Sequence, residues 1–168
     1  ATAVMLSSLF SLGLEDEAGR VRMALLGKEV ENRFIGVKSG IMDQFAVALG
    51  RAGTALFLDC ATLERRYVPL ELGKYEIVVM NTNKSRALVE SRYNERRSEC
   101  DRALADLQKS GVTIRSLGDL SVEEFEQAAD AIHDPVCRRR ARHAVFENAR
   151  VLSAVAALES GRIAEFGR

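Results

Sequence analysis

The chain has 168 residues, which is enough for one domain or for parts of two. Its 47% apolar and 29% charged residues are typical of a soluble globular protein. The 24 basic and 24 acidic residues balance, and no apolar run approaches the roughly 20 residues of a membrane helix. We therefore expect neither a nucleic-acid partner nor a membrane partner.

Cysteine usage indicates the compartment. Cys60, Cys100 and Cys137 are odd in number and far apart in the sequence, which argues against a disulfide framework or a metal cluster. A reducing cytosol is then the expected environment.

The first segment reads as a helix over residues 1–12, with an apolar stripe from Val4 to Phe10. Gly13 stops it. The helix has no cap before it and the chain has no start methionine, so we expect an internal fragment.

A second helix is expected over residues 14–34, because the acidic residues 15–17 suit a helix N-terminus. Its inner face is predicted to carry Val21, Leu25 and Val30.

Residues 36–45, GVKSGIMDQF, mark the change from a glycine-containing loop to an apolar helix over 41–49. Gly40 permits a close backbone approach or a positive φ. Asp43, three residues later, lies where the first helical turn favours anions, and a carboxylate there can accept a proton from a substrate hydroxyl. The alternative interpretation is a helix cap or dipole partner.

Three strands are expected next. Residues 54–59 and 64–69 read as a hairpin, since the second run ends at Pro69. Residues 75–81 form a continuous apolar run, which predicts a third strand in a buried position.

Helices are expected to dominate the remainder. A long helix over about 87–110 is predicted to direct Tyr93, Cys100, Leu104 and Leu107 inward and to end at Gly111. Ser121 and Glu124 form a capping-box signature that opens a short helix to about residue 131.

A further long helix is expected over residues 135–159, with Val145, Ala149, Leu152 and Ala156 inward, and the start of another over 162–168. The basic run 138–143 is interpreted as a solvated or ion-paired face, because the net charge is zero and no aromatic residues are interleaved. Neither histidine has a ligand-spaced partner.

Several segments carry a resemblance to a known family. The segment GIMDQF at 40–45 resembles the catalytic segment of galactokinases, which belong to a superfamily with homoserine and mevalonate kinases. The segments NTN (81–83), SRYNERR (91–97), RRARHAV (139–145) and ENAR (147–150) agree with it in order and spacing.

The resemblance implies an α+β fold in two domains. Residues 1–72 would be a remnant of an N-terminal domain of ribosomal-protein type, including the hairpin. Residues 73–168 would be part of a ferredoxin-like C-terminal domain. The active site would lie in the cleft between the two.

The resemblance also implies roles for five residues. Asp43 would be the catalytic base, with Gly40 and Tyr93 binding substrate beside it. Glu31 would help to hold Mg²⁺, and Arg86 would lie near the phosphates, although family members place an arginine one position earlier. From local pattern alone, the sequence favours a core position for Tyr93 and a solvated charge for Glu31.

The implied reaction is ATP-dependent phosphorylation of α-D-galactose at its C1 hydroxyl, in the cytoplasm and with Mg²⁺. The family's phosphate loop, its upstream sugar-binding residues and a second glycine-rich motif are absent from this chain. We therefore expect the chain itself to be inactive and to self-associate through exposed faces. A related hexose or hexosamine kinase and a non-catalytic galactose sensor are the alternatives.

Overall fold

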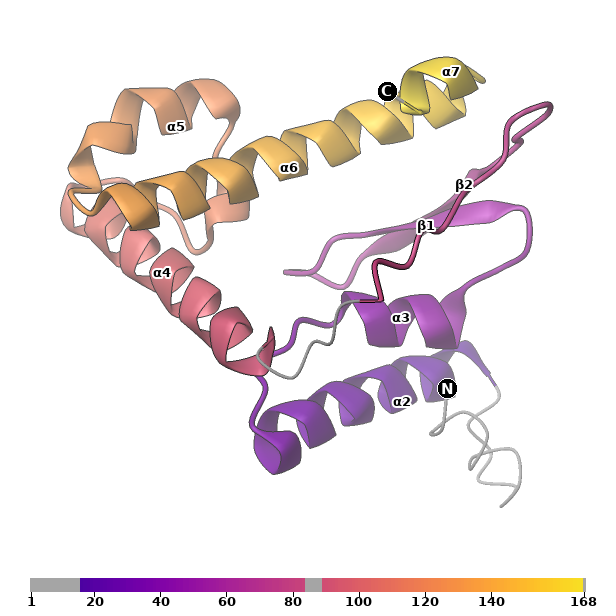
Figure 1. Ribbon diagram of the computed structural model, residues 1–168, viewed down its shortest axis with the longest axis horizontal. Coiled ribbons are helices and arrows are strands. Elements are labelled where there is room, and N and C mark those ends of the chain that lie inside the picture. The colour runs from indigo at the N-terminus through magenta and orange to yellow at the C-terminus, as the bar shows by residue number, and fades with distance from the viewer. Residues whose placement is uncertain (1–15, 84–88, 168) are drawn as a thin grey trace. The chain divides into compact units, whose positions relative to one another are not determined.

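The computed structural model describes residues 16–83 and 89–167 (Figure 1). These residues form helices and one two-stranded antiparallel sheet, which confirms the α+β class. The chain divides into two compact units, each taken by itself here. Unit 1 comprises residues 1–80 and 157–168, and unit 2 comprises residues 81–156. The first predicted helix, with its stripe from Val4 to Phe10, lies outside the described residues.

Unit 1 begins with the α-helix α2 (Glu17–Glu29), which continues directly into the π-helix η1 (Val30–Ile35). The Asp16 carboxylate caps α2 by accepting the Gly19 N–H at 2.7 Å. The helix expected over 14–34 is thus confirmed from Glu17 onward. Its last part has wider turns, with each N–H bonded five residues back.

The predicted inner face of this helix was right for Val21, which is partly buried and packs on the core of unit 1, and wrong for Leu25 and Val30. Met23 and Ala24 are buried, whereas Leu25 and Val30 are 42% and 45% exposed. The buried positions follow from where the next helix packs, and the sequence spacing of the apolar residues does not contain that information.

The core of unit 1 forms where α2 packs against α3 (Met42–Leu49), as Figure 1 shows. Ile41, Phe45 and Leu49 lie together with Ala24 in this core, and Phe45 is fully buried. Spacings of four residues place these side chains on one face of α3. The expected helix over 41–49 is confirmed.

The predicted hairpin is also confirmed. β1 (Thr54–Leu58) pairs antiparallel with β2 (Arg65–Pro69), with Leu56 opposite Tyr67. Partly buried Leu56 and Leu58 pack on the core of unit 1.

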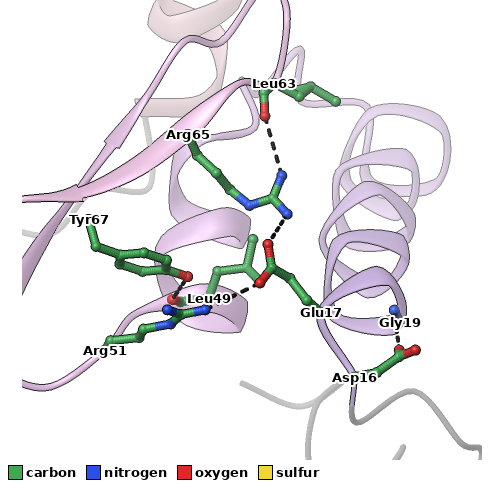
Figure 2. Close-up of polar contacts among 8 residues, drawn as sticks. All are labelled: Asp16, Glu17, Gly19, Leu49, Arg51, Leu63, Arg65 and Tyr67. Carbon is green, nitrogen blue, oxygen red and sulfur yellow. Dashed lines mark hydrogen bonds and ion pairs between the residues drawn. The ribbon is translucent and has the colours of Figure 1, made fainter.

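A polar network joins the start of α2 to the hairpin (Figure 2). The Glu17 carboxylate accepts hydrogen bonds from Arg51, at 3.2 Å, and from Arg65. The Arg51 guanidinium stacks on the Tyr67 ring at 3.8 Å, and the Tyr67 hydroxyl donates to the Leu49 carbonyl at 2.9 Å. These contacts tie helix, loop and strand together.

The third strand expected over residues 75–81 was wrong. The segment makes no ladder with any described residue, and Ile77, Val78, Val79 and Met80 are 64–90% exposed. An apolar run becomes a strand only where a neighbouring strand pairs with its backbone. The described residues supply no such partner.

Unit 2 is helical. It contains α4 (Val89–Lys109), the 3-10 turn η2 (Leu117–Asp119), α5 (Val122–Ala128), the 3-10 turn η3 (Ala129–Ala131) and most of α6 (Pro135–Glu159). The short α7 (Ile163–Phe166) belongs to unit 1. Helices were expected over 87–110, 121–131, 135–159 and from 162; α5 to α7 confirm the last three, and α4 confirms the first from Val89 onward.

The core of unit 2 gathers Leu107, Phe125, Ile132, Cys137 and Val145, all at most 1% exposed. On α4 the buried residues are Glu99, Ala103 and Leu107, which repeat every four residues. Cys100 and Leu104 lie at its margin, as predicted in part, whereas Tyr93 is 41% exposed.

On α6 the inward prediction held for Val145 and failed for Leu152 and Ala156, which are exposed. In the last turns of α6 the buried residues are instead Val155, Ala157 and Leu158.

Two capping boxes begin the short helices of unit 2. Ser121 and Glu124 form the box that the sequence predicted, with bonds of 2.8 and 3.1 Å. Ser116 and Asp119 form a second one around η2. The sequence did not reveal this second box because aspartate replaces the usual glutamate and the turn that follows is very short.

The basic run of α6 is ion-paired, as expected. Arg138 pairs with Asp130 at 2.9 Å, Arg140 with the buried Glu99 at 2.6 Å, and Arg142 with Glu126. In the described ranges, no helix is long and apolar enough to cross a membrane.

Candidate active site

The candidate site of unit 1 is built on the loop that joins η1 to α3. Gly36 ends the π-helix in the left-handed conformation, with φ of 84°. The Glu31 carbonyl then accepts both the Gly36 N–H and, at 3.0 Å, the Val37 N–H. Glycine suits this position because other residues are strained at positive φ. The turn brings residues 37–41 back along η1.

A side chain of η1 holds the far end of this loop. The Asn32 amide nitrogen donates to the Ser39 carbonyl at 3.2 Å and to the Ser39 hydroxyl at 3.3 Å. The same nitrogen donates to the Lys28 carbonyl at 2.8 Å. Asn32 therefore links the end of α2 to the peptide immediately before Gly40.

Asp43 lies in the first turn of α3, one residue after its first helical position. The N-cap is Ile41 and no side chain caps this helix, so the cap interpretation of Asp43 was wrong, whereas its place in the first turn fits the dipole interpretation. Its side chain is exposed, with no hydrogen bond or ion pair to any residue in the described ranges. The carboxylate is available to a ligand, next to helix N–H groups that lack intrahelical partners.

Gly40 precedes α3 by two residues and does not have a positive φ. A Cβ built on it would meet no atom within 4 Å. Neither backbone conformation nor packing in the described residues demands glycine here. The space on this side of the Gly40 backbone is open.

Glu31 is half-buried in η1, and its carboxylate makes no hydrogen bond or ion pair with another side chain of the described residues. One carboxylate fits a Mg²⁺ ion, which is held in kinases by one or two carboxylates, substrate phosphates and water. In the described part of the chain, no cluster of three or more histidine, cysteine or acidic residues forms a complete metal site. Glu31 could thus contribute one ligand of a shared site.

The structure brings Glu31, Gly40 and Asp43 into unit 1, whereas Tyr93 belongs to unit 2. Tyr93 is outside the core cluster and 41% exposed, so the core interpretation of this residue was wrong. Arg86 lies outside the described residues.

The sequence analysis missed two polar residues next to the site. One is Asn32. The other is Gln44, which packs against Gly27 and buries an amide oxygen without a hydrogen-bond donor in the described ranges. The only available signal was a polar residue adjoining each predicted site residue, since Asn32 follows Glu31 and Gln44 follows Asp43.

Comparison with known proteins supplies an independent line of evidence. The sequence profile of the family described as GHMP kinases N terminal domain matches residues 1–51. A galactokinase from Lacticaseibacillus casei is 51% identical over 164 residues, and one from Clostridium acetobutylicum is 48% identical over 167 residues.

A solved structure is also similar. The crystal structure of Lactococcus lactis galactokinase complexed with galactose superposes with a TM-score of 0.88 at 47% identity, over 98% of this chain. The chain spans 41% of the length of that structure and 41–42% of the two relatives.

Proposed function

We propose, from the premise that 98% of this chain aligns with a galactokinase at 51% identity, that it forms part of the active site of a longer galactokinase. The observation that carries the proposal is the exposed, unpaired Asp43 at the start of α3, beside the open Gly40 backbone. The longer protein is called the full-length enzyme below.

The proposed reaction moves the γ-phosphoryl group of ATP to the C1 hydroxyl of α-D-galactose. The bond between galactose O1 and phosphorus forms, and the bond from that phosphorus to the β,γ-bridging oxygen breaks. The hydroxyl proton passes to Asp43, and ADP and galactose 1-phosphate leave. Proton transfer of this kind typically contributes about 10²–10⁴-fold to the rate.

Gly40 lets the sugar approach the backbone, and Tyr93 contacts the hexose. Glu31 is the proposed protein ligand of Mg²⁺, with Arg86 near the phosphates. The ion, when bound, offsets the negative charge of the β- and γ-phosphates. Galactose is preferred over another hexose because the similar Lactococcus structure is a galactose complex.

The proposal extends to domains and location. Residues 1–72 belong to an N-terminal domain of ribosomal-protein type, and residues 73–168 to a ferredoxin-like domain. The enzyme is cytoplasmic, which agrees with the free thiols of Cys60, Cys100 and Cys137.

The test of the proposed function is Asp43→Asn in the full-length enzyme. We expect kcat to fall by at least ~10²-fold, because the amide cannot accept the proton. The melting temperature should not change, since the side chain is exposed. Asp130→Asn, at a 99% exposed carboxylate of unit 2, is the control and should retain activity. Near-normal turnover of the Asp43 variant would refute the role of Asp43.

The 168-residue chain alone should release no ADP in response to galactose, because it spans only 41–42% of the length of its galactokinase relatives. A coupled ADP assay measures this directly, and galactose-dependent ADP release by the chain would contradict it.

A further inference from the structure

We propose that Asn32 is a positioning residue that orients the Ser39–Gly40 peptide toward the sugar. The inference rests on the proposed function, since it assigns a role within the same site. The Asn32 amide shares its two hydrogens among three acceptors, which are the Lys28 carbonyl and the carbonyl and hydroxyl of Ser39.

Asn32 restrains the carbonyl end of the Ser39–Gly40 peptide. Its amide nitrogen donates to the Ser39 carbonyl at 3.2 Å and to the Ser39 hydroxyl at 3.3 Å. The peptide between Ser39 and Gly40 is planar and trans, so its N–H points opposite to its carbonyl. Holding the carbonyl against η1 therefore directs the Gly40 N–H away from η1.

The Asn32 side chain is itself held in place against α2. Its nitrogen also donates to the Lys28 carbonyl at 2.8 Å, one turn back in α2, and the residue is partly buried. Because the amide bonds to one backbone carbonyl in α2 and to one in the loop, it holds the two at a fixed distance. A side chain locked on a helix gives more precise positioning than a loop alone.

Other hydrogen bonds also restrain the loop of residues 37–41. In the loop, the Val37 N–H donates to the Glu31 carbonyl, the Ser39 N–H donates to the Val37 carbonyl at 2.7 Å, and the Ile41 carbonyl accepts the Phe45 N–H at 3.1 Å. Lys38 and Gly40 each make a further contact. Asn32 supplies a side-chain hydrogen bond across the loop at the peptide that precedes Gly40. Asp43 is fixed separately, because Phe45 and Leu49 anchor α3 in the core.

These two separate supports predict a distinctive kinetic effect. Loosening the Gly40 peptide misplaces the sugar relative to Asp43, while the groups that hold ATP are unaffected. A displacement of about 1 Å at a reacting centre can cost about 10²-fold in rate. The affinity for galactose should suffer more than the affinity for ATP.

The test uses Asn32→Asp and Asn32→Ala in the full-length enzyme. Aspartate has the same shape but cannot donate, and alanine removes the donor without adding charge. We expect kcat/KM for galactose to fall at least ~10-fold in both, with KM for ATP within ~2-fold of wild type. Ser39→Ala removes one acceptor and should have a smaller effect.

Asn148→Asp is the matched control, because it makes the same change at an exposed amide of unit 2 that donates to the Gly118 carbonyl at 3.4 Å. It should behave as wild type. A folded Asn32→Asp enzyme with unchanged galactose KM and kcat would overturn the inference. An equal rise of both substrates' KM, or loss of folding in both Asn32 variants, would also overturn it in favour of a general structural role.

A second readout does not depend on activity. In the 168-residue chain, NMR should show the Ser39 carbonyl ¹³C and Gly40 amide ¹⁵N resonances shifting in Asn32→Asp and not in Asn148→Asp. If the wild-type full-length enzyme lacks galactokinase activity, the proposed function fails and this measurement still decides the hydrogen bond. Unchanged resonances would show that Asn32 does not hold the Ser39–Gly40 peptide.

Discussion

At the scale of single residues, Gly40 allows a sharp test of the sugar site, because its backbone lacks the positive φ that usually requires glycine. A Cβ at this position would meet no atom within 4 Å. Gly40→Ala should therefore leave the melting temperature unchanged, while the added methyl group obstructs the sugar. We expect galactose KM to rise about tenfold, which corresponds to about 1.4 kcal/mol. Steady-state kinetics and thermal melting measure the two effects.

Gly118→Ala is the control for this substitution. Gly118 also lacks a positive φ, and its Cβ would meet the Ser116 hydroxyl oxygen at 3.5 Å, an ordinary contact. It lies in unit 2, and its kinetics should match wild type. An unchanged galactose KM in Gly40→Ala would remove Gly40 from the sugar site.

Tyr93 gives a second test at the residue scale. It is 41% exposed and outside the core cluster, so Tyr93→Ala should cost little stability. Loss of a sugar contact should raise galactose KM about tenfold without changing KM for ATP. Tyr75→Ala is a matched control, because this tyrosine is 43% exposed and lies in unit 1. If both variants had the same galactose KM, Tyr93 would be a surface residue with no part in sugar binding.

Single-residue predictions from sequence succeeded where a local pattern was sufficient. The Ser121–Glu124 capping box depends on residues three apart and was predicted correctly. Asn32 was not predicted, because its contact spans seven residues and depends on the wide turns of η1. The roles of Glu31, Gly40, Asp43, Tyr93 and Arg86 stay predictions until they are measured.

At the scale of elements, three carboxylates at helix starts link the stability of unit 2 to pH. Backbone N–H groups of Arg115 and Ser116 lower the pKa of Asp119. The Ser121 N–H and hydroxyl lower the pKa of Glu124. The Val136 N–H, and then the side chain and N–H of Cys137, lower the pKa of Asp134.

The direction in which stability changes with pH follows from the difference between the folded and unfolded pKa values. Each folded-state pKa lies below the ordinary value of 3.8 for aspartate or 4.5 for glutamate, so the unfolded state binds protons more readily. The stabilising effect is complete above those ordinary values and is lost as pH falls through the lower folded values. We expect the melting temperature of the chain to fall as pH is lowered from about 5 to about 3.

The triple variant Asp119→Asn, Glu124→Gln, Asp134→Asn should flatten this dependence, because each amide keeps an acceptor oxygen but does not titrate. Glu123→Gln, next to Glu124 but with none of these bonds, should keep the wild-type slope. A wild-type slope in the triple variant would mean that other groups govern acid unfolding.

The ends of helices and strands were predicted well because glycines, prolines and capping residues mark them in this sequence. The faces of the elements were predicted less well. Leu25, Val30 and Leu152 are apolar at helical spacing, yet they lie exposed. Burial depends on where a neighbouring element packs, and periodicity reports only that a residue is apolar.

At the scale of the whole molecule, exposed apolar residues favour self-association of the 168-residue chain. Ile77, Val78, Val79 and Met80 form one contiguous run, 64–90% exposed. Burial of apolar surface contributes about 25 cal/mol per Å², and an extended segment without a ladder can pair with another. We expect the mass from light scattering to fall toward the monomer on dilution.

A charge in this run should weaken the association. Val79→Asp, at a 90% exposed position, should shift the dilution curve toward monomer, because pairing would then bury a carboxylate. Ser160→Asp, an exposed polar position, is the control and should leave the curve unchanged. A chain that is monomeric at every concentration would contradict the expectation.

The π-helix η1 limits which deletions the site can tolerate during evolution. Its wide turns hold one residue more than an α-helix of the same length would. Deleting one residue between Val30 and Ile35 would restore the tighter α-helical pattern and change where the side chains of this segment lie around the helix axis. Asn32 would then no longer reach the Ser39 carbonyl. A deletion that makes the helix more regular would thus remove the site, so selection for activity would preserve a locally less favourable geometry.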